Sequence, residues 1–171
     1  SSTSSTYTVS MWFKYTGVQR NELNLLFSLG QSNDANSAFM GIDNNDKFVV
    51  YNSGGYQFTS TRVYRDPSAW YHIVAIWDSN NSTAGDRIRL YVNGVRETAF
   101  DQSDNPNQSQ GSVMNTNDAG GSDWGEGKHR IGRFSNYADY TGCYYAEVNF
   151  VDGQAYDPSY FGFTDPVTGI W

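Results

Sequence analysis

Acidic residues near the end of the chain are the first candidates for chemistry. Glu147 and Asp152 lie in a run that alternates like a β-strand. Retaining glycoside hydrolysis needs two carboxyl groups about 5–5.5 Å apart. Five positions along a strand place two side chains on opposite faces, roughly 16 Å apart. This pair therefore does not predict a hydrolase, and Glu147 is expected to be an outward-facing or hydrogen-bonded acid.

The histidines and the cysteine offer no second route to catalysis. Neither His72 nor His129 has a Ser, Cys or second His at the spacing of a nucleophile motif. We expect His72 to be a packed, hydrogen-bonded side chain on a strand. Cys143 is the only cysteine, so it cannot form an internal disulfide, and we expect it to pack as a small apolar residue.

Two clusters of Asp and Asn could hold a metal ion. Calcium takes about six to eight oxygen ligands, which carboxylates, amides and backbone carbonyls supply. Neither cluster matches an EF-hand or a glycine-rich calcium repeat, and ordinary Asx turns are the alternative interpretation. Beyond a structural calcium ion, no cofactor is expected. The clusters are Asp43, Asn45 and Asp46, and Asn117, Asp118 and Asp123.

Aromatic residues in polar loops could bind a glycan. An aromatic ring can stack on a sugar face while neighbouring Asp, Asn and backbone groups bind the hydroxyls. The alternative is that the tryptophan anchors the long loop and the tyrosines cap the fold. The predicted glycan-binding group is Trp124, Asp123, Asn136, Tyr137 and Tyr140.

Short strands must position these groups, and the clearest ones lie mid-chain. The run Trp70–Trp77 is apolar at nearly every position, which predicts a central strand covered on both faces. The run Ile88–Val92 alternates, which predicts a half-buried strand, and Asn93 with Gly94 predicts a type I′ turn after it. Pairing about that turn sets Leu90 opposite Glu97, so we expect a bulge or a longer loop.

Further strands are expected on both sides of this region. Within residues 23–30 we expect Leu25, Phe27 and Leu29 to face inward. Strict alternation over residues 143–151 places Tyr145 on the same face as Glu147. Asp157 and Pro158 predict about one helical turn, and the polar stretch 101–127 predicts a loop that is functional or disordered. The other expected strands are Tyr7–Tyr15, Ala38–Ile42, Lys47–Tyr51, Tyr56–Val63 and Lys128–Phe134.

These patterns predict an all-β fold, an antiparallel two-sheet jelly-roll sandwich with at most one or two helical turns. The length of 171 residues suits a single domain over residues 1–171, and the abrupt start in a strand favours a fragment of a longer chain. The net charge of −7 argues against a nucleic-acid partner. No apolar run is long enough for membrane insertion.

Several segments, in this order, resemble the concanavalin A-like, or laminin G-like, jelly-roll family. The last part of the chain, Tyr144–Gly162 followed by Thr164–Trp171, is similar to the end of laminin G-like domains in structural proteins of tailed bacteriophages, notably those of cyanobacteria and marine bacteria. The other segments that carry the likeness are Tyr7–Lys14, Leu25–Gly30, Trp70–Asp78, Ile88–Val95 and His129–Arg133.

The phage resemblance implies a non-enzymatic virion surface protein: a tail fibre, a tail-tip protein, or a capsid decoration or cement protein. Its lectin-like module would serve adhesion or particle stabilisation. The implied partners are other virion proteins, copies of the chain itself in a homo-oligomer such as a trimer, and a host-surface glycan. The implied location is the virion exterior, and otherwise the extracellular space.

Two other functions remain open within the same family. One is a free extracellular lectin that binds carbohydrate with calcium. The other, less expected, is a glucan hydrolase, because some family members are glucanases. Their catalytic strand carries Glu-x-Asp-x-x-Glu, whereas the similar strand here has Glu147, Asn149 and Val151 on that face.

Overall fold

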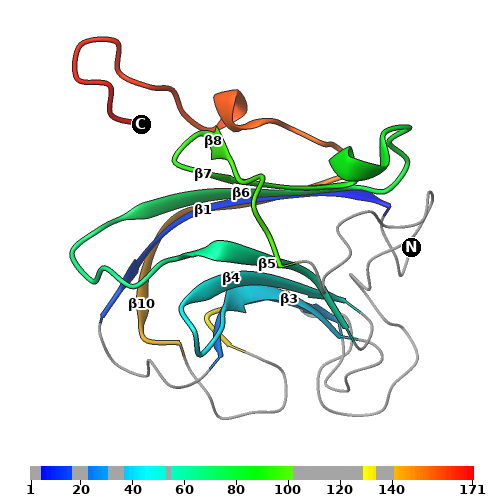
Figure 1. The fold of residues 1–171 in the computed structure, drawn as a ribbon, viewed down its shortest axis with the longest axis horizontal. Coiled ribbons are helices and arrows are strands. Elements are labelled where there is room, and N and C mark those ends of the chain that lie inside the picture. Colours follow the sequence, from blue (N-terminus) through cyan, green and yellow to red (C-terminus); the bar gives the residue numbers. More distant parts are fainter. Residues whose placement is uncertain (1–4, 17–22, 31–36, 53–54, 102–128, 134–140) are drawn as a thin grey trace.

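The computed structural model describes residues 5–16, 23–30, 37–52, 55–101, 129–133 and 141–171. These residues form two five-stranded antiparallel sheets that pack face to face (Figure 1). The predicted antiparallel jelly-roll sandwich is confirmed. The first sheet has the order β10-β1-β6-β7-β8, and the second has the order β5-β4-β3-β2-β9. The strands are β1 (Thr6–Tyr15), β2 (Asn24–Gly30), β3 (Ser37–Ile42), β4 (Lys47–Asn52), β5 (Gly55–Val63), β6 (Tyr71–Asp78), β7 (Ile88–Val92), β8 (Val95–Arg96), β9 (Arg130–Ile131) and β10 (Cys143–Asp152).

Helical structure in the described part of the chain consists of two 3₁₀ turns, η2 (Ala84–Asp86) and η3 (Pro158–Tyr160). The carboxylate of Asp157 caps η3 by accepting a hydrogen bond from the backbone N–H of Ser159. Proline is tolerated in this first turn because its missing N–H would be unpaired there anyway. The predicted single turn is confirmed. No described helix is long and apolar enough to cross a membrane.

The main core lies between the two sheets. Alternate residues of a strand project to opposite faces, and on β1 the inward set Val9, Met11 and Phe13 is completely buried. Burial of side chains of this size contributes about 1.5–3 kcal/mol each. One face of β1 is therefore part of the core between the sheets. Opposing residues from the second sheet include Leu26, Leu29, Met40, Ile42, Phe48, Val50 and Phe58.

The strand β6 is buried on both faces, as its apolar run predicts. Seven of its eight residues are buried. Ile73 and Trp77 belong to the main core, whereas Val74 and Ile76 alternate with them and lie on the outer face of the first sheet. The C-terminal segment, residues 153–171, crosses over this outer face (Figure 1). The cover on the second face of β6 therefore comes from the end of the chain.

A bulge in β2 changes which residues face the main core. The register between β2 and β3 shifts between Leu25 and Phe27. Leu26 and Phe27 both join the main core, while Leu25 packs in a separate cluster with Phe39 and Val49. The prediction that Leu25 faces the main core is wrong, because an extra residue in a strand reverses the alternation beyond it.

A second irregularity lies in β10. Its register with β1 shifts, and Glu147 has a positive φ of 49°. Tyr145 and Val148 consequently both pack against the main core. The predicted strict alternation, with Tyr145 and Glu147 on one face, is therefore wrong. Cys143, at the start of β10, packs against the core as expected, and burial raises the pKa of its thiol to about 12.

The predicted turn joins β7 to β8 as a two-residue hairpin. Asn93 and Gly94 both have positive φ, 49° and 76°. The expected bulge or longer loop does not occur, since the ladder continues with the Glu97 N–H donating to the Leu90 carbonyl at 2.8 Å. The carboxylate of Glu97 pairs with Arg62 of β5 at 3.1 Å. This ion pair gives the carboxylate opposite Leu90 a partner in the other sheet.

The chain beyond β8 closes one side of the sandwich. It crosses to the second sheet and pairs along β5 (Figure 1). Thr61 donates its N–H to the Ala99 carbonyl at 3.2 Å, and Asp101 donates its N–H to the Thr59 carbonyl at 2.9 Å. An edge strand without such cover could pair with another chain. Of the predicted strand at residues 128–134, the structure describes residues 129–133, and β9 occupies two of them.

Candidate functional site

An open cleft of about 560 Å³ lies on the outer face of the first sheet. We call it the outer-face cleft. β1 and β10 supply one residue each, and the C-terminal segment supplies the others. The lining residues are Trp12, Glu147, Phe161, Gly162, Phe163, Asp165, Thr168, Ile170 and Trp171.

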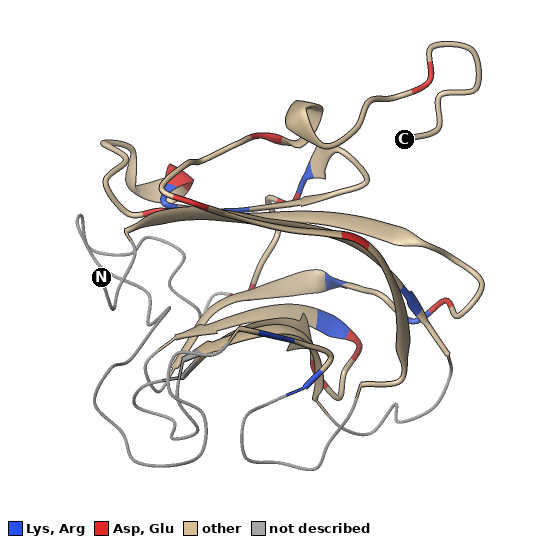
Figure 2. Ribbon diagram, turned by 180° about the vertical axis from the view of Figure 1, so that it is seen from behind, with Lys and Arg blue, Asp and Glu red and all other residues tan. Residues whose placement is uncertain are grey.

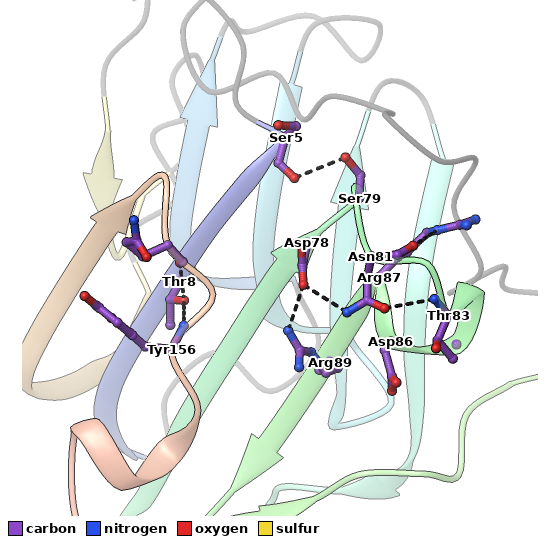
Figure 3. A network of polar contacts seen from close by, with 12 residues as sticks. Ser5, Thr8, Asp78, Ser79, Asn81, Thr83, Asp86, Arg87, Arg89 and Tyr156 are labelled. Carbon is purple, nitrogen blue, oxygen red and sulfur yellow. Dashed lines mark hydrogen bonds and ion pairs between the residues drawn. The ribbon is translucent and has the colours of Figure 1, made fainter.

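Thr8 of β1 anchors the beginning of the C-terminal segment. Its hydroxyl donates to the carbonyl of Gln154 at 2.8 Å and accepts from the backbone N–H of Tyr156 at 2.9 Å (Figure 3). Gly153 also donates its N–H to the Thr6 carbonyl at 2.9 Å. Thr8 is completely buried. One hydroxyl on the outer face thus satisfies two backbone groups of the segment that crosses over it.

Trp171 attaches the other end of the segment. Its indole N–H donates to Nδ1 of His72 at 2.9 Å, and the two ring planes are inclined by 25°. A Cβ atom at Gly94 would overlap the indole ring, and a Cβ at Gly162 would lie 2.9 Å from its Cζ2 atom. Only glycine fits at these two positions while the indole stays in place. We call the set of His72, Gly94 and Gly162 the Trp171 socket.

His72 lies between the two tryptophans of the cleft. Its side chain is buried, with 2% of the residue exposed, and its ring centroid lies 4.8 Å from that of Trp12. An indole N–H can only donate, so Nδ1 accepts and the imidazole proton lies on Nε2, which donates to Ser10 Oγ at 3.0 Å. Burial lowers the pKa of His72 to about 4. The packed, hydrogen-bonded His72 is as predicted.

Asp165 shapes the loop at the end of the C-terminal segment. Its carboxylate accepts hydrogen bonds from the backbone N–H groups of Thr168 at 3.0 Å and Val167 at 2.7 Å. These bonds stabilise the ionised form and lower the pKa of Asp165. Its own N–H donates to the Ile170 carbonyl at 2.8 Å. The loop is therefore held by internal hydrogen bonds while Val167 at its tip is 91% exposed.

The outer-face cleft combines apolar ring faces with carboxylate oxygens. Phe163 is 75% exposed, and the ring of Trp12 is half-buried. The whole stretch Tyr144–Trp171 contains four acidic residues and no Lys or Arg, and Figure 2 shows red without blue along its C-terminal segment. Such a surface repels anions. It suits ligands that present an apolar face together with hydroxyl donors.

The glycan-binding group predicted from the sequence lies outside the described residues. This holds for Trp124, Asp123, Asn136, Tyr137 and Tyr140, and the structure neither assembles nor separates them. Their role stays a prediction. The same is true of Asn117 and Asp118 in the second predicted metal cluster.

The first predicted metal cluster lies in the turn between β3 and β4. Asp43 Oδ1 accepts from the backbone N–H groups of Asn45 at 2.9 Å and Lys47 at 2.8 Å, and Asp46 has a φ of 63°. These are the features of an Asx turn. Over the described ranges, no group of three or more His, Cys, Asp or Glu side chains is arranged to hold a metal ion. Calcium at this turn stays a prediction.

The outer-face cleft itself was missed by sequence analysis. Trp12 and His72 were predicted only as strand residues, and residues 163–171 only as loop. A usable signal was present, since the apolar outer face of β6 required a cover that no predicted strand supplied. The aromatic residues concentrated between Tyr144 and Trp171 were the available source of that cover.

Comparison with known proteins agrees with this architecture. A family model described as the concanavalin A-like lectin/glucanases superfamily matches residues 1–152. The chain belongs to this superfamily. The match ends with β10, so the C-terminal segment that forms most of the cleft lies beyond it. A search of curated protein sequences gives no match.

Solved structures align with the chain at low sequence identity. A Trypanosoma rangeli sialidase in complex with the inhibitor DANA aligns with a TM-score of 0.57 and 11% identity, covering 90% of this chain and 21% of that one. The CBM40 of a Ruminococcus gnavus IT-sialidase, bound to alpha2,6 sialyllactose, aligns with a TM-score of 0.47 and 14% identity. The alignment covers 81% of this chain and 70% of that one. A heptameric SAP-like pentraxin from Limulus polyphemus aligns with a TM-score of 0.46 and 14% identity, covering 86% of this chain and 64% of that one. The chain thus spans about a fifth of the length of the sialidase, and the likeness is one of fold.

Proposed function

We propose that this superfamily member is a non-enzymatic, lectin-like module that binds a neutral glycan in the outer-face cleft. The observation that carries the proposal is the composition of that cleft, in which Trp12 and Phe163 offer ring faces beside the Glu147 carboxylate. Sugar rings pack on aromatic faces, and their hydroxyls donate to carboxylates. An acidic sugar is disfavoured, because Glu147 and Asp165 line the cleft and the C-terminal segment carries no cation.

We further propose that the module lies on the exterior of a bacteriophage virion, as part of a tail fibre, a tail tip or a capsid decoration protein. The motif that resembles phage structural proteins, Tyr144–Trp171, supplies every lining residue of the cleft except Trp12. The expected partners are other virion proteins, further copies of the chain in a homo-oligomer such as a trimer, and a glycan of the host surface. Mass spectrometry of purified particles tests the location, and absence of the chain from them would refute it.

Glycan binding is tested with an array that carries neutral and sialylated oligosaccharides. We expect signals from neutral glycans, and Trp12→Ala should weaken them about tenfold through the loss of ring contact. Tyr56→Ala is the matched control, because Tyr56 is an aromatic residue on β5 of the other sheet and is 47% exposed. It should leave binding unchanged.

Two outcomes of the array would contradict the proposal. Binding restricted to sialylated glycans would contradict the charge argument. Binding that survives Trp12→Ala but disappears in Trp124→Ala would move the site to the loop group predicted from the sequence, Trp124, Asp123, Asn136, Tyr137 and Tyr140.

A glucan hydrolase is the second candidate, because the cleft holds two carboxyl groups, Glu147 and Asp165. A glycosidase of this kind needs one carboxylic acid that keeps its proton near neutral pH. The backbone hydrogen bonds to Asp165 act in the opposite direction and lower its pKa. Asp165 is therefore unsuited to the role of general acid, and we propose binding without hydrolysis. Release of reducing ends from laminarin or agar, abolished by Glu147→Gln, would reverse this order.

A further inference from the structure

His72 connects two walls of the outer-face cleft to the sheet beneath them. On one side its ring lies 4.8 Å from the ring of Trp12, measured between centroids. On the other side its Nδ1 accepts the indole N–H of Trp171 at 2.9 Å. Both tryptophans line the cleft, whereas His72 does not. A change at His72 can therefore reach the cleft only through the residues it holds.

The groups packed around His72 are neutral. From β1 come Ser10, whose Oγ accepts from Nε2, and Trp12. From the turn after β7 comes Asn93, whose side-chain oxygen accepts the backbone N–H of His72 at 2.8 Å. The C-terminal segment contributes Trp171. The carboxylates of the neighbourhood, Glu147 of β10 and Asp165 of the C-terminal segment, line the cleft instead.

We propose that His72 is a positioning residue for the cleft: its neutral imidazole holds Trp171 in the socket, and protonation of Nδ1 releases that wall. Protonated Nδ1 carries a hydrogen that points at the hydrogen of the indole N–H, and neither group can then accept. Gly94 and Gly162 leave room for the indole ring, and neither has a side chain that could accept its N–H. The predicted effect on ligand binding rests on the proposed function, whereas the release of Trp171 does not.

The direction of the pH effect follows from the two states of His72. Exposed, the imidazole titrates at its ordinary pKa of 6.5, and in the socket it titrates at about 4. Between these values the released state binds more protons, so acid favours release. Attachment of Trp171 is most favourable above pH 6.5, and its free energy becomes less favourable as the pH falls from 6.5 towards 4. With these two values, acidification from pH 7 to pH 5 shifts the equilibrium towards release by at most about 20-fold.

The test is fluorine NMR on protein labelled with 5-fluorotryptophan, titrated from about pH 7.5 to about pH 5, where the histidine charge changes. Trp171→Phe assigns the Trp171 resonance, and the resonance of the core residue Trp77 shows that the sandwich stays folded. His72→Gln replaces the imidazole by an amide that can accept the indole N–H at every pH. His129→Gln is the matched control, because His129 is the other histidine of the chain.

We expect the Trp171 resonance to move towards that of an exposed indole on acidification in the wild type and in His129→Gln, and to stay constant in His72→Gln. A Trp171 resonance that does not move in the wild type, or that moves equally in His72→Gln, would overturn the proposal. Titration of the best neutral glycan from the array is run alongside. Absence of glycan binding at every pH would overturn the proposed function alone, because the NMR result does not depend on a ligand.

Discussion

One added methyl group at Gly94 tests the Trp171 socket, because a control glycine with nearly the same φ angle exists elsewhere in the chain. Gly94 and Gly153 have φ values of 76° and 77°. A Cβ at Gly94 would overlap the indole of Trp171, whereas a Cβ at Gly153 meets no atom within 4 Å. Gly94→Ala and Gly153→Ala therefore share the backbone penalty and differ in the steric one.

The two costs can be estimated separately. Alanine in the left-handed region costs about 1 kcal/mol relative to glycine. Gly94→Ala must also displace the half-buried indole and its hydrogen bond to His72, which adds about 2 kcal/mol. For a chain of this length, 1 kcal/mol corresponds to about 3 °C in melting temperature. We expect Tm to fall by about 3 °C in Gly153→Ala and by about 9 °C in Gly94→Ala.

The double variant with Trp171→Ala separates the steric cost from all others. Trp171→Ala alone should cost about 2 kcal/mol, and adding Gly94→Ala to it should cost only the backbone term of about 1 kcal/mol. Urea denaturation of the four proteins in this cycle measures the free energies of unfolding. If Gly94→Ala is as mild as Gly153→Ala, or if the single costs add fully in the double variant, the socket does not bind Trp171 as described.

Three further predictions concern single residues. Glu147→Gly should raise the free energy of unfolding by about 0.5 kcal/mol, because glycine adopts the positive φ of this position without strain. It should also weaken glycan binding on the array. A loss of stability would show that the backbone at Glu147 is not strained. Phe13→Ala should lower the unfolding free energy by about 3–5 kcal/mol through a core cavity, and a cost as small as that of Tyr56→Ala would contradict its place in the core. Wild-type Tm should fall more steeply than that of His72→Gln as pH drops from 6.5 towards 4, and parallel profiles would rule out His72 as the cause.

Most of the strands could be predicted from the sequence, because alternation and turn chemistry are local properties. Asn93 and Gly94 accept positive φ wherever they occur in a chain, so the hairpin between β7 and β8 was predictable from two residues. The ion pair that Glu97 forms beyond this hairpin was not predictable. The sequence pairs this acid with Leu90, but its partner Arg62 lies on a strand of the other sheet, and no local pattern relates them.

Which side chains of a strand face the core was predictable only up to the first register shift in that strand. In β2 and β10, one extra residue moves Leu25 away from the main core and Glu147 into the cleft. Whether a strand contains a bulge depends on its register with the neighbouring strand. The sequence of the strand alternates in the same way with or without the bulge, so the pattern alone does not reveal it.

The amino-acid sequence by itself determined most of the strands, the two-sheet fold and a β6 too apolar to be exposed on either side, because side-chain period and hydrophobicity act over a few residues. Only the tertiary structure decided that the C-terminal segment supplies the missing cover, that Trp171 binds between His72 and two glycines, and that a cleft results. The contacts of Trp171 with His72 and Gly94 join the end of the chain to its middle. Their energies arise from burial and hydrogen bonding between partners that no sequence spacing relates.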